Sequence, residues 1–214
     1  DAFIDGATSL NLKGLDIEAK RTGWTVSLAA GLAGATGDKG NAVAGSVGVN
    51  VSTYTVETGL RNITGLVLIS GPVRLNADDD TNIIAIAGSG AFGGKGGYGV
   101  AIGFSYTENI VRSQISALTN FKHTGNLEVL ANSQGLIVAV TGSVGVATGK
   151  QSGTGGAGTV TINILKNTVE AKILNTTTAA DSSGNITLLA EDSTSIFAFA
   201  GAFGNKLLRP DPKR

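Results

Sequence analysis

A four-part pattern repeats along this chain of 214 residues and constrains the fold more than any other feature. It is clearest between residues 127 and 173. The first part of each copy ends in an alanine: Ala19, Ala77, Ala131 and Ala190. Successive alanines are 58 (77−19), 54 (131−77) and 59 (190−131) positions apart. A repeat of this length is typical of stacked architectures, in which neighbouring copies bury a continuous core.

The second part of each copy alternates bulky and small side chains. The bulky positions are Val26 and Leu28, Ile84 and Ile86, Val138 and Val140, and Phe197 and Phe199. The small residues between them are Ser27, Ala85, Ala139 and Ala198. Alternation with a period of two, without a sustained period of 3.6, predicts β-strands. Stacked in register, the bulky side chains form a ladder, and we expect this ladder to be the core.

Glycine-rich connections of variable length join the second and third parts. The third part contains Val47, Ile102 and Val160, and the fourth contains Val56, Val111 and Val169. The copies span residues 14–71, 72–125, 126–184 and, in part, 185–205, and residues 206–214 form a tail or linker. The sequence therefore predicts a single all-β domain over residues 1–205, a β-solenoid of about 3.5 copies of a ~57-residue repeat.

Parallel strands joined by crossovers favour right-handed coiling, so the expected form is a right-handed parallel β-helix. Two geometries fit the period: two to three short turns of a triangular helix in each copy, or one wide, flattened turn with long strands back to back. Ala2–Ile4 matches Ala171–Ile173, so the chain begins within a copy. We expect it to be part of a longer polypeptide.

Composition excludes several functions. Lys and Arg total 16, as do Asp and Glu, and no basic stripe is present, so nucleic acid is not an expected partner. No apolar run reaches 18 residues, so membrane insertion is not expected. Cysteine is absent, which excludes disulfides and thiolate metal sites. His123 is the only histidine, which excludes a catalytic triad and a multi-histidine metal site. Its place between copies predicts a partly exposed turn.

Asp78, Asp79 and Asp80 form the sharpest polar cluster, at an expected turn between the first two parts of the second copy. Clustered carboxylates can bind calcium, and paired aspartates serve catalysis in some parallel β-helix enzymes. The same turn carries other residue types in the other copies, which favours a solvated turn. No enzyme activity and no cofactor are expected, and bound calcium at this cluster is the alternative.

Three aromatic residues are candidates for ligand binding: Trp24, Tyr54 and Tyr98. Trp24 lies just outside the bulky ladder, and the two tyrosines lie at strand ends or turn tips. Exposed aromatic rings can stack on sugars while Asn, Thr and Asp bind the hydroxyls. The alternative is that Trp24 caps the end of the core.

The succession of strand, glycine-rich turn and strand, followed by Asn167–Ile173, resembles the repeats of giant leukotoxin-like and filamentous-haemagglutinin-like bacterial exoproteins. The resemblance implies a secreted or cell-surface β-helix used in adhesion. A further analogy, of fold alone, is to β-helical carbohydrate-binding modules. The expected function is therefore non-catalytic binding of an extracellular polysaccharide. The alternative is a structural spacer or stalk of an adhesin with no ligand of its own.

Overall fold

The computed structural model describes residues 1–149 and 153–207 of the chain. Strand makes up 82% of the structure, and the described residues contain no helix. It follows that none of them forms a helix that could cross a membrane. The expected all-β class is confirmed. Of the expected tail, residues 208–214 lie outside the described part, whereas Lys206 still belongs to the last strand.

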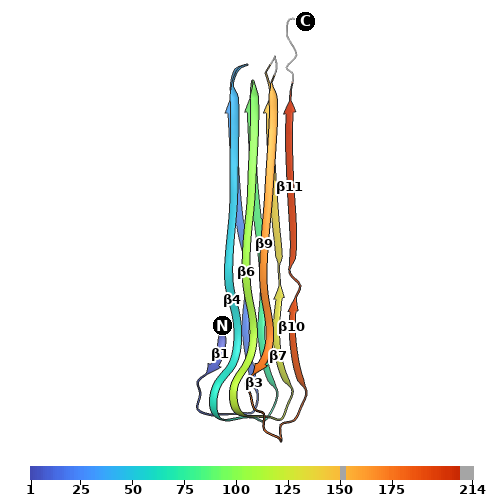
Figure 1. Ribbon diagram of the computed structural model, residues 1–214. Coiled ribbons are helices and arrows are strands. Elements are labelled where there is room, and N and C mark those ends of the chain that lie inside the picture. The colour runs from blue at the N-terminus through green and yellow to red at the C-terminus, as the bar shows by residue number, and fades with distance from the viewer. Residues whose placement is uncertain (150–152, 208–214) are drawn as a thin grey trace.

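The strands form two parallel sheets, called sheet A and sheet B here. Sheet A contains β1 (Ala2–Asp5), β2 (Leu10–Leu12), β4 (Asn41–Ile69), β6 (Gly96–His123) and β9 (Thr154–Leu174). Sheet B contains β3 (Leu15–Ala35), β5 (Val73–Gly93), β7 (Leu127–Gln134), β8 (Leu136–Ala147), β10 (Ile186–Asp192) and β11 (Ser195–Lys206). In Figure 1 the long strands run side by side and nearly straight, and those of sheet A curve at the lower end.

Successive copies of the repeat lie next to one another in both sheets. β3 and β4 belong to the first copy, β5 and β6 to the second, and β7, β8 and β9 to the third. Ala19 pairs with Ala77, Ala77 with Ala131, and Ala131 with Ala190, so the predicted register is confirmed. Each full copy thus supplies one wide stretch of strand to each sheet, which agrees with the flattened geometry.

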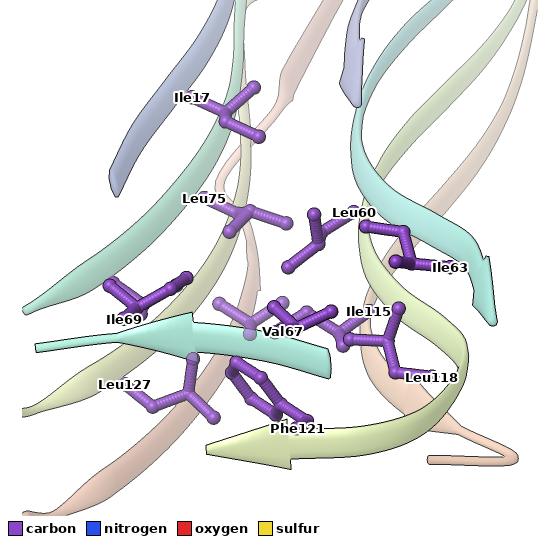
Figure 2. Packing of buried hydrophobic residues seen from close by; sticks show 12 residues of the cluster. Ile17, Leu60, Ile63, Val67, Ile69, Leu75, Ile115, Leu118, Phe121 and Leu127 are labelled. Atoms are coloured by element: carbon purple, nitrogen blue, oxygen red, sulfur yellow. The ribbon is translucent and has the colours of Figure 1, made fainter. Parts of the chain in front are cut away.

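Most of the largest buried side chains gather in one cluster, where the sheet A strands curve (Figure 2). This core contains Ile17, Leu60, Ile63, Val67, Ile69, Val73, Leu75, Ile115, Leu118, Phe121, Leu127 and Val129. The curve is made at equivalent positions of three copies, Asn62, Ala117 and Asn175, which have φ angles of 56°, 54° and 48°. A left-handed residue turns the chain sharply, and asparagine tolerates that conformation better than most residues.

The interior of the upper end is lined by small side chains. Ala85, Ala87, Ala101 and Ala139 are buried there between the two sheets. The backbones approach so closely that a Cβ at Gly99 of sheet A would lie 2.6 Å from the carbonyl oxygen of Val144 in sheet B. Above Ile83 and Ile137, the inward positions of β4, β5, β6 and β8 hold only alanine, serine, threonine, asparagine and glycine, because a larger side chain would push the sheets apart.

The expectation that the bulky ladder is the core is therefore wrong. Val26, Leu28, Ile86, Phe197 and Phe199 are exposed on the outer side of sheet B. Alternation correctly predicted that bulky and small residues lie on opposite sides of each strand. The narrow gap between the sheets reverses the expected sides, since it admits only the small ones.

Candidate binding surface

The outer side of sheet B presents a broad apolar surface above the lower core, which we call the ridged face. It consists of the outward residues of β3 from Trp24 on, of β5 from Asn82 on, of β8 and of β11. None of these outward residues is charged. Isolated exposed apolar residues are ordinary, but a contiguous uncharged surface of this kind marks an interaction site.

Two ridges and a furrow cross the upper part of the ridged face from strand to strand. A further bulky row, formed by Val26, Ile84, Val138 and Phe197, lies directly below the first ridge. The first ridge is formed by Leu28, Ile86, Val140 and Phe199, which pair in register. The furrow beside it has a floor of Ala30, Gly88, Gly142 and Gly201. The second ridge is formed by Leu32, Val144 and Phe203, with Gly90 between the first two. The side chain of Leu32 leans over Gly90, since a Cβ there would lie 3.1 Å from its Cδ1.

The furrow is a measurable hollow. A groove of about 540 Å³ is lined by both its floor and its walls, among them Gly142, Val144, Phe199 and Phe203. Its lining is mostly aliphatic and aromatic carbon, which favours an apolar occupant over a hydrated one.

Trp24 lies at the lower border of the ridged face, on β3, and is 66% exposed. The expectation that it is accessible is confirmed, and the alternative that it caps the core is wrong. Its cross-strand neighbour is Asn82, whose amide donates a hydrogen bond to Asp80 Oδ1 at 3.3 Å. Thr22 and Asp80 are paired across the strands two positions away, on the same side of the sheet. We call this group, Trp24 with Thr22, Asp80 and Asn82, the Trp24 platform.

Tyr54 does not contribute to any surface, contrary to expectation. It is only 8% exposed and points between the sheets. Its hydroxyl donates to Asp79 Oδ2 at 3.1 Å, and the Arg21 guanidinium lies 3.5 Å from its ring centroid. Burial raises the pKa of Tyr54 to about 12. The tyrosine is instead part of a polar interior contact where the narrow upper gap begins.

The three aspartates are separated by the strand itself. Residues 78–80 lie within the continuous strand β5 and not in a turn, so their side chains alternate between the two sides of sheet B. Asp79 points inward and is 1% exposed, whereas Asp78 pairs with Lys20 at 2.8 Å. Among residues 1–149 and 153–207, no group of three or more potential ligands could hold a metal ion. The alternative of a calcium-binding cluster therefore finds no support in these residues, and the expected solvated turn is wrong because residues 78–80 lie within a strand.

Tyr98 and His123 lie away from the Trp24 platform. Tyr98 is exposed, but it belongs to the outer side of sheet A, on the opposite face of the molecule from Trp24. The three candidate aromatic residues thus do not form one site. His123 is buried at the end of β6, contrary to expectation, with its ring 5.3 Å from that of Phe121. Its Nδ1 is 2.9 Å from the carbonyl oxygen of Gly125, which gives the imidazole a structural role.

These features define the class of the protein as all-β, with two face-to-face parallel sheets and a ridged apolar surface. Comparisons of the chain with models of known protein families, with curated protein sequences and with solved structures found no match. The ridged face is the feature that sequence reasoning missed. The phase of the glycines gave no clear signal for it: Gly99, Gly103 and Gly145 alternate in phase with the small residues, whereas Gly88 and Gly142 alternate in phase with the bulky ones.

Proposed function

We propose that this chain is a β-solenoid of the right-handed parallel β-helix type, each copy forming one flattened turn. It serves as a non-catalytic module of a secreted or cell-surface protein and binds polysaccharide. The exposure of Trp24 on a flat outer face, beside polar side chains, carries the binding proposal.

The chemistry of the Trp24 platform suits a sugar chain. The indole offers an apolar surface on which the C–H face of a pyranose can stack. Thr22 and Asp80 lie on the same side of the sheet and can bond to sugar hydroxyls. Asn82 is less available, because its Oδ1 accepts a hydrogen bond from the backbone N–H of Leu136 at 3.0 Å.

Binding at this site should be weak, with a dissociation constant on the order of micromolar to millimolar. A shallow, solvated platform desolvates few groups, and ordering a flexible polymer opposes association. Salt should change the affinity little, since the 16 Lys and Arg residues balance the 16 Asp and Glu residues and the chain has no net charge to be screened.

The test is affinity gel electrophoresis in gels that contain xylan, pectin or cellulose derivatives. Trp24→Ala should abolish most of the retardation of the wild type while leaving the melting temperature nearly unchanged. Tyr98→Ala is the matched control, because it removes an exposed aromatic ring from the opposite face. If a gel that retards the wild type retards Trp24→Ala equally, the Trp24 platform is not the polysaccharide-binding site.

A purely structural spacer is the second candidate, and one observation favours it. The residues that align with Trp24 in the other copies are Asn82, Leu136 and Ser195, so the platform occurs once rather than in every copy. If no polysaccharide retards the wild type, the spacer function replaces the binding function.

A further inference from the structure

We propose that the ridged face of sheet B is a docking surface for a second copy of this chain, giving a face-to-face dimer. The occupant is inferred from the shape, chemistry and area of the face. This inference is independent of polysaccharide binding, which concerns the border of the face at Trp24.

The ridged face is self-complementary in shape: a ridge of one copy can fit into the furrow of another. Its furrow at Gly142 lies between two ridges, each about 6.6 Å away along the strands. A two-fold axis parallel to the ridges, midway between the furrow and the second ridge, brings the second ridge of each copy over the furrow of the other. The first ridge then faces the row of Gly34, Phe92, Val146 and Asn205. Figure 1 shows the strands of sheet B running nearly straight, so the rows can stay matched across them.

The side chains of the ridges project far enough to fill a facing furrow. Leu28 and Leu32 are at least three-quarters exposed, and Phe199 and Phe203 are more than half exposed. Between Phe199 and Phe203 the groove of about 540 Å³ is open and lined mostly by apolar atoms. Burial of these side chains is favourable because it removes apolar surface from water.

No charge opposes the contact. The outward positions of the ridged face hold only apolar side chains, glycine, Asn82, Ser195 and Asn205. Charged residues lie only at the border of the face, where Asp80 precedes Asn82 on the same side of β5. A charge buried without a partner is costly, so a face without charges suits close association.

The area is sufficient for a stable dimer. β8 has 12 residues and spans about 40 Å. The rows from Leu28 upward, which face the partner and leave Trp24 free, span about 26 Å, and four strands side by side span about 19 Å, so about 500 Å² is covered on each copy. A specific interface should bury at least about 1,000 Å² in total, which the two copies together reach. The apolar rows of sheet A span only three strands and offer a smaller face.

Gly142 provides a substitution that blocks the furrow without disturbing the fold. A Cβ at Gly142 would meet no atom within 4 Å, and the residue points outward. Gly158 of β9 is the matched control, since a Cβ there also meets no atom within 4 Å and it lies on the outer side of sheet A. Gly142→Glu and Gly158→Glu therefore add the same charged side chain to opposite faces.

The experiment is sedimentation equilibrium of the full chain over a range of concentrations, with circular dichroism and thermal melting to verify folding. The wild type and Gly158→Glu should show twice the mass of the 21.4 kDa chain. Gly142→Glu should sediment as a monomer with an unchanged melting curve, apart from the loss of any stabilisation by dimerisation. Ala30→Glu, in the same furrow on β3, should reproduce the effect.

Three results would overturn the proposal. The first is a monomeric wild type, whether or not it floats with phosphatidylcholine vesicles or binds a polysaccharide. The second is a dimer that survives Gly142→Glu and Ala30→Glu, as pairing through the open edges of the sheets would. The third is a dimer that only Gly158→Glu dissociates, which would place the contact on sheet A.

Discussion

Asp79 is the residue at which burial and charge conflict most clearly. Its carboxylate lies between the sheets, where it accepts hydrogen bonds from Thr81 Oγ1 at 2.8 Å and from Tyr54. These two hydroxyls do not fully replace water, and burial raises the pKa of Asp79 above its ordinary value. The charged form therefore destabilises the folded state relative to the protonated form.

Asp79→Asn should stabilise the protein at pH 7. A raised pKa in the folded state means that protonation favours folding. The stabilisation of the folded state by the protonated carboxyl is fully present below the pKa that Asp79 has in the unfolded chain, about 3.8. It is lost as the pH rises through the higher pKa that Asp79 has in the folded protein. Asparagine keeps an acceptor for Tyr54 and removes the charge. The advantage of the variant in urea unfolding should thus shrink toward pH 3.8.

An exposed carboxylate gives the control for this comparison. Asp16 lies on the same sheet with its side chain 65% exposed, so Asp16→Asn should change stability by less than about 0.5 kcal/mol. If Asp79→Asn is less stable than the wild type at pH 7, the hydrogen bonds of the carboxylate outweigh its desolvation, and the expectation is wrong.

At the scale of the strands, alternation predicted the pairing but not the buried side. Besides the alanine register, Val47 pairs with Ile102 and Ile102 with Val160, as expected, and Ile4 pairs with Leu60. Period two fixes which residues share a side. It does not fix which side is inside, because that depends on the distance between the sheets. The same uncertainty explains why Tyr54 and Asp79 were misplaced: both occupy inward positions of continuous strands.

A pair of neighbouring substitutions in β5 tests the buried side. Ala87 is buried, and a Cβ added at Gly48 of sheet A would lie only 3.5 Å from the Cβ of Ala87. Ala87→Leu should therefore overpack the gap and destabilise the protein by about 1–3 kcal/mol or more. Ile86 is 38% exposed and points outward, so Ile86→Asp should cost much less. Thermal melts of both variants measure this, and the opposite order would restore the bulky ladder as the core.

At the scale of the whole molecule, stability should depend on the position of each copy in the stack. The second copy, β5 and β6, has neighbours on both sides in its sheets, whereas every residue of β10 is exposed. In stacked repeats each copy is stabilised mainly by its neighbours, and local opening follows from missing ones.

Native-state hydrogen exchange should reveal this gradient. The slowest amide exchange is expected in the middle of β5 and β6 and the fastest in β10 and β11. Mass spectrometry of peptic fragments resolves these segments. Uniform exchange rates throughout the sheets would instead mean that the stack opens only as a whole. Dimerisation through the ridged face should add protection to β8 and β11 that is lost in Gly142→Glu.

The length of the paired strands sets how the protein responds to mechanical force. β3 and β5 are aligned in parallel over 21 residues, and the hydrogen bonds between them run across the strand direction. A pull along the strands shears all of these bonds together, so the load is shared among them. A pull that lifts one end of β11 from its neighbour peels the bonds in succession, and a far smaller force suffices. The molecule should therefore be stiff along its strands and weak to peeling at its outer copies.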